Sequence, residues 1–302
     1  MTAPLLVVQD LCRTYRSRGW MGRGFVTRAV DGVSFQVMPG ETLGLVGESG
    51  SGKSTTGRLV MGLEEPDAGR VVFAGTDLTA LSPAARKPFR RRMQIVFQDP
   101  YAALNPRMRV GDFVEEPLVV HGLGGGAAQR REEVAGLFRT VGLDPAFMRR
   151  FPHEFSGGQR QRIGIARAIA LQPEFLVADE PITALDVSIQ AQIVNLFQDL
   201  QERMGLALLF IAHDLSMVRY LCNRVAVMLK GRIVEAGPTE AVFNDARHPY
   251  TRALLSAVPI PDPLRERGRR RIVFDAGGYA FPPDAALREV GGGHLVLQGA
   301  ST

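Results

Sequence analysis

One stretch of this sequence, Gly47-Glu48-Ser49-Gly50-Ser51-Gly52-Lys53-Ser54-Thr55, fits the pattern G-x-x-x-x-G-K-[ST] of a phosphate-binding loop. An apolar run at residues 42–46 predicts a buried strand before it, and residues 55–62 predict a helix after it. Glycines let backbone N–H groups close around phosphate oxygens, with the positive end of the helix behind them. In such a loop Lys53 reaches the β- and γ-phosphates, and the Ser54 hydroxyl binds Mg²⁺. A chance glycine-rich turn is the alternative, but four fixed positions in this context favour a nucleotide site.

The composition allows a large folded core. The chain has 302 residues, of which 45% are apolar and 22% charged, so one large domain or two smaller ones are possible and global disorder is disfavoured. The net charge of +5 is modest. Arginines cluster at residues 90–92 and 269–271, but no aromatic residues alternate with them as in a stacking platform. Solvated surface is the favoured interpretation of these clusters, ahead of an anionic membrane face and of nucleic acid.

Cysteine usage and hydropathy bear on where the protein works. Cys12 and Cys222 are the only cysteines and lack metal-ligand spacing, which disfavours disulfide scaffolds and cysteine-bound clusters. Residues 1–10 lack a basic region followed by a long apolar run, so no signal peptide is expected. No run approaches about 18 apolar residues, the length that a membrane-spanning helix needs. We therefore expect an intracellular protein that is soluble or peripheral to a membrane.

The first part of the chain predicts strands around the phosphate-binding stretch. Residues 5–11 and 29–37 are the candidate strands, and the basic, glycine-containing residues 13–28 between them are predicted as a loop. Tyr15 follows the first strand. Its ring could stack on an adenine base, or it could be an ordinary tyrosine at a strand end, and position alone does not separate the two.

A short strand and a helical region follow. Residues 71–75 and 95–97 are predicted strands, the second ending at Gln98 before Asp-Pro. A glutamine there can move between a Mg²⁺-bound and a withdrawn state, although such a residue alone is more often plain surface. Between about residues 101 and 172 the pattern becomes helical, with a clear 3.6-residue period over residues 130–141.

A second candidate anion site lies in the helical region, at Phe155-Ser156-Gly157-Gly158-Gln159-Arg160-Gln161-Arg162. Ser156 has the character of a helix N-cap, and the two glycines would expose N–H groups at the start of the helix predicted at residues 163–171. A capped helix and nothing more is the simpler alternative if the segment is taken alone.

Two acids follow the buried strand predicted at residues 175–178. Charges at the carboxyl end of a strand emerge where open α/β sheets bind ligands. Asp179 could hold Mg²⁺ through water, and Glu180 could orient or deprotonate an attacking water. Capping of the next helix is the alternative. Another buried strand, residues 207–211, leads to His213, which could contact a γ-phosphate or be an ordinary structural residue.

The last predicted elements are a helix at residues 187–204 and a hairpin. The hairpin joins strands at residues 225–229 and 232–235 around Lys230-Gly231.

Taken in order, these motifs resemble the ATP-binding subunits of ABC transporters, in particular the oligopeptide and dipeptide importer group, over about residues 5–243. The matching parts are the phosphate loop, the glutamine loop at Gln98, the signature Phe155-Ser156-Gly157-Gly158-Gln159, the Walker B strand ending at Glu180, the D-loop near Ala184-Leu185-Asp186 and the switch histidine His213. The fold class implied is α/β: a P-loop NTPase (RecA-like) core with an antiparallel β subdomain and a helical signature subdomain at about residues 101–172. The implied ATP-binding domain covers residues 1–245, and a short, partly irregular C-terminal extension covers residues 246–302.

The narrower resemblance to peptide importers rests on three stretches: Phe97-Gln98-Asp99-Pro100-Tyr101-Ala102-Ala103-Leu104-Asn105-Pro106-Arg107-Met108, Leu185-Asp186-Val187-Ser188-Ile189-Gln190-Ala191-Gln192 and His248-Pro249-Tyr250-Thr251-Arg252-Ala253-Leu254-Leu255. Three departures from the family pattern are visible. Phe155 replaces the commoner leucine, and Ile182-Thr183 replace Thr-Ser, but neither removes a phosphate-contacting group. Some relatives bind an iron–sulfur cluster through cysteines after the His-Pro-Tyr stretch. No cysteine follows Cys222, so no cluster is expected here, and the role of residues 263–302 is open.

The resemblance implies a mechanism with ATP and Mg²⁺. Tyr15 would lie against adenine. The metal would be bound by Ser54, Gln98 and Asp179. The catalytic residues would be Lys53, Gln98, Glu180 and His213. Residues 156–159 of a partner ATPase subunit would close over the γ-phosphate in a head-to-tail dimer, with Asp186 also near nucleotide. Two transmembrane permease subunits and an extracytoplasmic solute-binding protein complete the implied assembly, which places the chain at the cytoplasmic face of the inner membrane.

Two functions other than import fit these residues less well. A soluble ABC-type ATPase acting on nucleic acid or ribosomes usually has two cassettes or a long coiled coil, and this chain has one phosphate loop and no heptad run. A non-hydrolysing regulatory subunit conflicts with the intact Lys53, Asp179, Glu180 and His213. An importer of a metal, a glutathione-like molecule or a sugar is not excluded by the residues.

Overall fold

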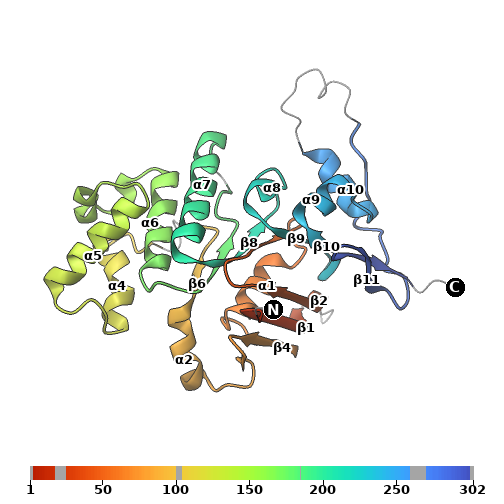
Figure 1. Ribbon diagram of the computed structural model, residues 1–302, viewed down its shortest axis with the longest axis horizontal. Helices are drawn as coiled ribbons and strands as arrows, with labels where there is room; N and C mark the ends of the chain where they lie inside the picture. The colour runs from red at the N-terminus through yellow and green to blue at the C-terminus, as the bar shows by residue number, and fades with distance from the viewer. Residues whose placement is uncertain (1–2, 18–24, 100–103, 184, 259–269, 300–302) are drawn as a thin grey trace. The chain divides into compact units, whose positions relative to one another are not determined.

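The computed structural model describes residues 3–17, 25–99, 104–183, 185–258 and 270–299 (Figure 1). These residues form two compact units: unit 1 comprises residues 1–80 and 209–302, and unit 2 comprises residues 81–208. Residues 100–103 of the peptide-importer stretch and Ala184 of the D-loop lie outside the described residues. The units are defined by packing, and the domain boundary expected near residue 245 stays a prediction.

A 4-stranded antiparallel sheet in unit 1 has the order β2-β1-β4-β5. Its strands are β1 (Leu6–Ser17), β2 (Phe25–Val37), β4 (Ala68–Phe73) and β5 (Thr76–Asp77). Leu6, Val8 and Leu11 of β1 are buried. The prediction of a loop at residues 13–28 was wrong at both ends, because Arg13 pairs with Val30 and the pairing continues through Ser17 and Phe25. Polar side chains there obscured a strand whose backbone groups are satisfied by its partner.

A second, mixed sheet in unit 1 carries the order β11-β12-β10-β9-β3-β8. The strands are β3 (Thr42–Val46), β8 (Ala207–Ala212), β9 (Arg224–Leu229), β10 (Arg232–Pro238), β11 (Ala286–Gly291) and β12 (His294–Gln298). β3 is buried along its whole length and runs parallel to β9. The predicted hairpin is confirmed: β9 and β10 pair antiparallel around Lys230 and Gly231, both of which have positive φ.

Four helices of unit 1 are α1 (Lys53–Val60), α8 (Val218–Leu221), α9 (Thr239–Asn244) and α10 (Pro249–Ala257). The helix predicted after the phosphate loop is α1, which starts two residues earlier than expected. The C-terminal extension contributes α10 and the β11–β12 hairpin, whose strand β12 pairs with β10. This pairing makes residues 286–298 part of the mixed sheet, where the sequence had left their role open (Figure 1).

Unit 2 contains a parallel strand pair, β6 (Met93–Val96) and β7 (Phe175–Asp179), in which Val96 is the partner of Ala178. Its helices are α2 (Pro83–Arg92), α4 (Val110–Val120), α5 (Ala127–Thr140), η1 (Pro145–Arg149), η2 (Pro152–Glu154), α6 (Gly157–Ile169) and α7 (Val187–Met204). The bounds of α7 are those predicted, and α5 covers all but the last residue of the helix expected at residues 130–141.

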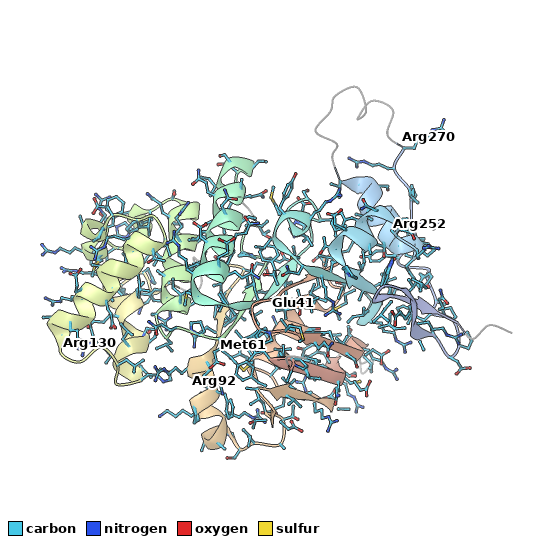
Figure 2. The ribbon with its side chains drawn as sticks, in the orientation of Figure 1. Glu41, Met61, Arg92, Arg130, Arg252 and Arg270 are labelled. Carbon is cyan, nitrogen blue, oxygen red and sulfur yellow. The ribbon has the colours of Figure 1, made fainter. Side chains whose placement is uncertain are left out.

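The helices α4, α5 and α6 pack on one another, and they lie side by side in Figure 1. Val114, Phe138 and Ile163, one from each helix, are fully buried. Polar contacts fix the same arrangement. Arg130 of α5, labelled in Figure 2, donates from Nε to Glu115 at 2.8 Å. The helix that begins with the two glycines is therefore packed against both of its neighbours.

The N-terminus of α10 contains a titratable cap, and it generates a prediction on pH. His248 Nδ1 accepts a hydrogen bond from the Tyr250 N–H at 3.2 Å, and its Nε2 lies 3.2 Å from the Tyr279 hydroxyl. Burial lowers the pKa of His248, and the nearby Glu235 only partly opposes this. The unfolded chain therefore binds the proton more readily than the folded chain. Stability from this group is complete above about pH 6.5 and is lost as the pH falls toward the lower folded-state pKa.

We expect His248→Asn to reduce this acid sensitivity, because asparagine is also a good N-cap but does not titrate. Urea unfolding of both proteins between pH 8 and pH 5 measures the effect. The wild type should lose more free energy of unfolding below about pH 6.5 than the variant does, by up to about 1 kcal/mol, the usual value of an N-cap. Parallel pH curves for the two proteins would contradict the assignment of His248 as a titrating cap.

Candidate nucleotide site

The phosphate loop (residues 47–55) joins β3 to α1 and is shaped by close backbone contacts. Gly47, Gly50 and Gly52 have φ of 153°, 80° and 106°. A Cβ on Gly47 would lie 2.2 Å from the Met228 carbonyl oxygen, and one on Gly52 would lie 2.0 Å from that of Ala29. A Cβ on Gly50 would meet nothing within 4 Å. Two of the glycines are therefore required by contact with neighbouring backbone, and the third lies in open space where a ligand can approach.

The start of α1 has the character of an anion site. Gly52 is its N-cap, has left-handed backbone angles and supplies no side-chain cap. The first turn carries no acidic residue. Helix N-termini of this kind direct N–H groups and the positive end of the dipole toward an anion. The residues present therefore fit the phosphates of a nucleotide.

Lys53 is the first residue of α1 and is only 3% exposed. Its ammonium group donates to the carbonyl oxygens of Gly47 at 2.8 Å and Glu48 at 2.9 Å, and it lies 3.4 Å from the Ser51 hydroxyl. A buried ammonium needs such oxygen partners, since removing it from water is costly. The charge is thus held inside the loop, where phosphate oxygens can take the place of the backbone carbonyls.

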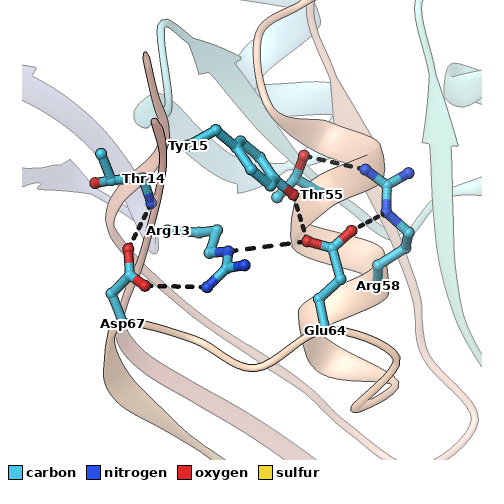
Figure 3. A network of polar contacts seen from close by, with 7 residues as sticks. All are labelled: Arg13, Thr14, Tyr15, Thr55, Arg58, Glu64 and Asp67. Carbon is cyan, nitrogen blue, oxygen red and sulfur yellow. Dashed lines mark hydrogen bonds and ion pairs between the residues drawn. The ribbon is translucent and has the colours of Figure 1, made fainter. Parts of the chain in front are cut away.

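Tyr15 lies at the centre of a polar network in unit 1 (Figure 3). Its hydroxyl donates to the Glu64 carboxylate, which also accepts from Arg58 Nε at 2.6 Å. Arg58 belongs to α1 and reaches the Thr55 hydroxyl at 3.4 Å. Arg13 adds a guanidinium 5.2 Å from the centre of the tyrosine ring. The network joins Tyr15 in β1 to the helix that follows the phosphate loop. Stacking of its ring on adenine stays a prediction.

Glu64 is the charged centre of that network. Burial alone would raise the pKa of its carboxyl, but the hydrogen bonds from Tyr15 and Arg58 and the charges of Arg58 and Arg13 outweigh this and lower it. Glu64 is therefore a carboxylate at neutral pH. It fixes the Tyr15 hydroxyl as a donor and so restrains the ring that carries it.

In unit 2 the structure brings together two residues that the sequence assigned to catalysis. Gln98 follows β6, and Glu180 follows the parallel strand β7. Gln98 Nε2 donates to Glu180 Oε2 at 2.9 Å, and the Thr183 hydroxyl donates to the same oxygen at 3.1 Å. Glu180 has a φ of 45°, in the left-handed region that non-glycine residues rarely adopt. Backbone strain of this kind clusters at functional sites.

The proposed metal-binding residues supply hard oxygen ligands. Asp179 is the last residue of β7 and is 5% exposed, and Ser54 lies in the first turn of α1. Carboxylate, hydroxyl and amide oxygens are the ligands that Mg²⁺ prefers, so the chemistry of Ser54, Gln98 and Asp179 fits that ion. These three residues come from both units, and their joint role stays a prediction.

The signature segment (residues 156–159) starts α6 as predicted. The Ser156 hydroxyl accepts from the Gln159 N–H at 3.3 Å, and the Ser156 N–H donates to Gln159 Oε1 at 3.0 Å, which is a capping box. A Cβ on Gly158 would lie 2.5 Å from Ile189 Cγ2 of α7. Gly158 is therefore required by helix packing, whereas Ser156 and Gly157 are exposed and available for a ligand or partner.

Two more predicted site residues lie on the surface. Asp186 is exposed at the N-cap of α7 without a side-chain capping bond. His213 is exposed and directly follows β8 in unit 1. Their assignment to a nucleotide site stays a prediction.

Sequence reasoning missed two contacts at the candidate site. Thr183 was noted as a departure from the family pattern, but not as a hydrogen-bond donor to Glu180. Tyr250 was noted as part of the His-Pro-Tyr stretch, yet its hydroxyl accepts a hydrogen bond from the Glu48 N–H of the phosphate loop at 2.9 Å. The short spacing between Glu180 and Thr183 could have suggested the first contact. The second joins residues 202 positions apart and has no local signal.

Comparison with known families agrees with this geometry. A family model described as ABC transporter matches residues 30–183, and one described as oligopeptide/dipeptide transporter, C-terminal region, matches residues 234–274. The oligopeptide transport ATP-binding protein OppF of Bacillus subtilis (strain 168) is 50% identical over 300 residues, which cover 98% of this chain and 97% of the relative. The protein of the same name from Streptococcus mutans is 51% identical over 293 residues, with coverage of 97% and 94%.

The chain belongs to the ABC transporter family. Solved structures of the family are similar to it. The dimeric ATP-binding cassette MJ0796, in a post-hydrolysis state with ADP and Pi, has a TM-score of 0.70 at 28% identity and covers 78% of this chain and 98% of its own. The cbiO1 protein from Clostridium perfringens, part of the transporter complex cbiONQ, has a TM-score of 0.70 at 27% identity and covers 80% and 91%. The predicted family, the P-loop NTPase fold and the ATPase class are thereby confirmed.

Among the described residues of this ABC protein, no helix is both long enough and apolar enough to cross a bilayer.

The packing of Gly158 generates a second prediction. Gly158→Ala should lower the free energy of unfolding by about 1–3 kcal/mol, because its Cβ would overlap the Ile189 side chain. Gly157→Ala is the matched control. Its Cβ would lie 3.3 Å from Leu185 Cδ2, a side-chain end that can move, so a smaller loss is expected. Urea unfolding of the two variants measures the difference.

A double variant tests the assigned cause. Ile189→Ala makes room for the new methyl group, so Gly158→Ala should destabilise the Ile189→Ala protein less than it destabilises the wild type. Additive losses in this double-mutant cycle would show that the two residues are not coupled and would overturn the packing explanation.

Proposed function

We propose that this chain is the ATP-binding and ATP-hydrolysing subunit of an importer for peptides or a similar small solute. The observation that carries the proposal is the phosphate loop, with two glycines pressed against neighbouring backbone and Lys53 buried within it. The match of residues 234–274 to the C-terminal region of oligopeptide and dipeptide transporters supports the choice of solute class. So do the two OppF proteins, which match almost the whole chain.

Binding of ATP begins at the phosphate loop. The N–H groups at the start of α1, which has no side-chain cap, would donate to the phosphate oxygens. The Lys53 ammonium would exchange its bonds to the Gly47 and Glu48 carbonyls for the β- and γ-phosphates. The ring of Tyr15 would lie against adenine, while its hydroxyl stays bonded to Glu64.

The metal would be held by the Ser54 hydroxyl, the Gln98 amide oxygen and, through water, the Asp179 carboxylate. Bound Mg²⁺ neutralises charge that develops on the phosphate oxygens during transfer. Gln98 donates from its amide nitrogen to Glu180 at 2.9 Å, which leaves its amide oxygen available for the metal. Gln98 would thus bind the metal and donate to the catalytic carboxylate at the same time.

Hydrolysis depends on Glu180 as the group that orients and deprotonates the attacking water. Gln98 and Thr183 donate to the same carboxylate oxygen, Oε2, and so restrain the side chain of Glu180. The carboxylate held in this way would accept the proton of the attacking water. His213, after β8, would steady the γ-phosphate.

A second ATPase subunit would complete the site. Residues 156–159 of one subunit would close over the γ-phosphate bound to the other, with Asp186 near the same nucleotide. Exposure of Ser156 and Gly157 at a helix N-terminus supports this arrangement. The partner could be the same chain or, as is common in this group, a different one.

Two transmembrane permease subunits and an extracytoplasmic solute-binding protein would complete an importer, with this chain at the cytoplasmic face of the inner membrane. No role on nucleic acid is proposed.

Glu180→Gln tests the catalytic assignment. The variant keeps the size of the side chain and one accepting oxygen but cannot take up a proton, so ATP hydrolysis should fall by roughly 10²–10⁴-fold, the usual contribution of a general base. ATP binding, measured by calorimetry, should be retained. Lys53→Ala is the control that should lose binding. Unchanged turnover in Glu180→Gln would overturn the assigned mechanism.

The same variant reports on the partner subunit. Its mass in solution, measured with and without Mg-ATP, should double with ATP if the chain can pair with itself. A mass that stays monomeric while ATP is bound would assign the closing signature segment to a different subunit.

A further inference from the structure

The C-terminal extension contributes a hydrogen bond to the phosphate loop. The Glu48 N–H donates to the hydroxyl of Tyr250 at 2.9 Å, and Tyr250 is only 1% exposed. Glu48 directly follows the tightly packed Gly47, so its peptide group sets the direction in which the exposed part of the loop leaves β3. Tyr250 is the second residue of α10, in the extension.

A second hydrogen bond holds the other end of this part of the loop (residues 48–51). The Gly231 N–H, in the β9–β10 turn, donates to the Ser51 carbonyl oxygen at 2.9 Å. Residue Lys230 of the same turn donates from Nζ to the carbonyl oxygens of Gly277 at 2.8 Å and Tyr279 at 2.9 Å. The extension therefore contacts the loop directly at Glu48 and, through the turn, at Ser51. Residues 48–51 are clamped at both ends.

Tyr250 is itself fixed by an aromatic cluster of the extension, made of His248, Tyr250, Phe274, Tyr279 and Phe281. The ring centres of Tyr250 and Phe274 are 5.4 Å apart, and those of Phe274 and Tyr279 are 5.2 Å apart. The His248 N–H donates to Glu235 Oε2 at 3.0 Å, which ties the start of α10 to β10. The aromatic packing and the hydrogen bonds at the start of α10 therefore restrict the position of the Tyr250 hydroxyl.

The chemistry of the hydroxyl suits a fixed acceptor. Burial raises the pKa of Tyr250 to about 12, although the hydrogen bond from Glu48 lowers it. The group stays neutral at physiological pH, so it accepts the Glu48 N–H without placing a negative charge beside a loop that must receive phosphates.

We infer that Tyr250 is a positioning residue for ATP binding: the C-terminal extension, through the Tyr250 hydroxyl, holds the phosphate loop in its phosphate-binding shape. The inference rests on the proposed function of that loop. Tyr250 acts by fixing the Glu48 peptide group, so that ATP does not have to order the loop when it binds. Preorganisation of this kind raises affinity by lowering the entropic cost of binding.

Tyr250→Phe tests the inference because it removes the hydroxyl and keeps the ring that packs on Phe274. Loss of one neutral hydrogen bond should weaken Mg-ATP binding by about two- to tenfold. The KM for ATP should rise by a similar factor, while kcat at saturating ATP changes little. Amide hydrogen exchange at Glu48 in the ATP-free protein should become faster by a similar factor.

Tyr279→Phe is the matched control. It removes a hydroxyl from the same aromatic cluster, where the partner is His248 Nε2 rather than the loop. A merely structural role would make both variants less stable to heat and leave the Kd for ATP unchanged in both. The inference requires that only Tyr250→Phe changes the Kd and the exchange rate of the Glu48 amide.

Lys53→Ala separates this inference from the proposed function. If Lys53→Ala abolishes ATP binding and Tyr250→Phe binds as the wild type does, the positioning role is overturned and the nucleotide site stands. If Lys53→Ala binds ATP as tightly as the wild type, the proposed function fails and the inference fails with it. Weaker binding in both variants, with Tyr279→Phe unchanged, is the expected result.

Discussion

The candidate site depends on the close approach of two glycines to backbone from other strands. Gly47 packs on the carbonyl of Met228, at the end of β9, and Gly52 packs on that of Ala29 in β2. A side chain at either position would collide with atoms that cannot move without breaking a sheet. The sheets around the phosphate loop therefore fix Gly47 and Gly52, while Tyr250 and the β9–β10 turn hold the backbone between them. The loop is thus shaped for an anion before one binds.

The pair Gln98 and Glu180, to which we assign catalysis, is built on a different principle. Gln98 and Glu180 follow neighbouring parallel strands, and Val96, the last residue of β6, pairs with Ala178, the last but one of β7. Parallel pairing delivers both side chains to the same edge, as expected for open α/β sheets. Glu180 then adopts a left-handed backbone conformation, with a φ of 45°. The hydrogen bonds from Gln98 and Thr183 to its carboxylate offset the strain and hold the side chain in one orientation.

Local patterns were sufficient to predict the parts of the molecule whose signals are local. The phosphate loop, the strand before it, the N-cap at Ser156 and the bounds of α7 all follow from glycines, caps and apolar periods within a few residues. The parts that could not be predicted depend on distant pairing. Arg13 is paired with Val30 in a strand whose side chains are polar, and Tyr15 bonds to Glu64, 49 residues away. No periodicity in either segment contains that information.

The C-terminal extension illustrates the same limit and explains why it belongs to the ATPase core. Glu235 of β10 is fully buried, and a buried carboxylate is costly unless hydrogen bonds satisfy it. Its oxygens accept from the N–H groups of Arg247 and His248 and lie 2.8 Å from His294 Nε2. These partners come from the start of α10 and from β12. Removing the extension would therefore leave an uncompensated charge inside unit 1, beside the strand β9 whose Met228 carbonyl shapes the phosphate loop. The extension is part of the framework of the candidate nucleotide site, although the sequence analysis placed it outside the ATP-binding domain.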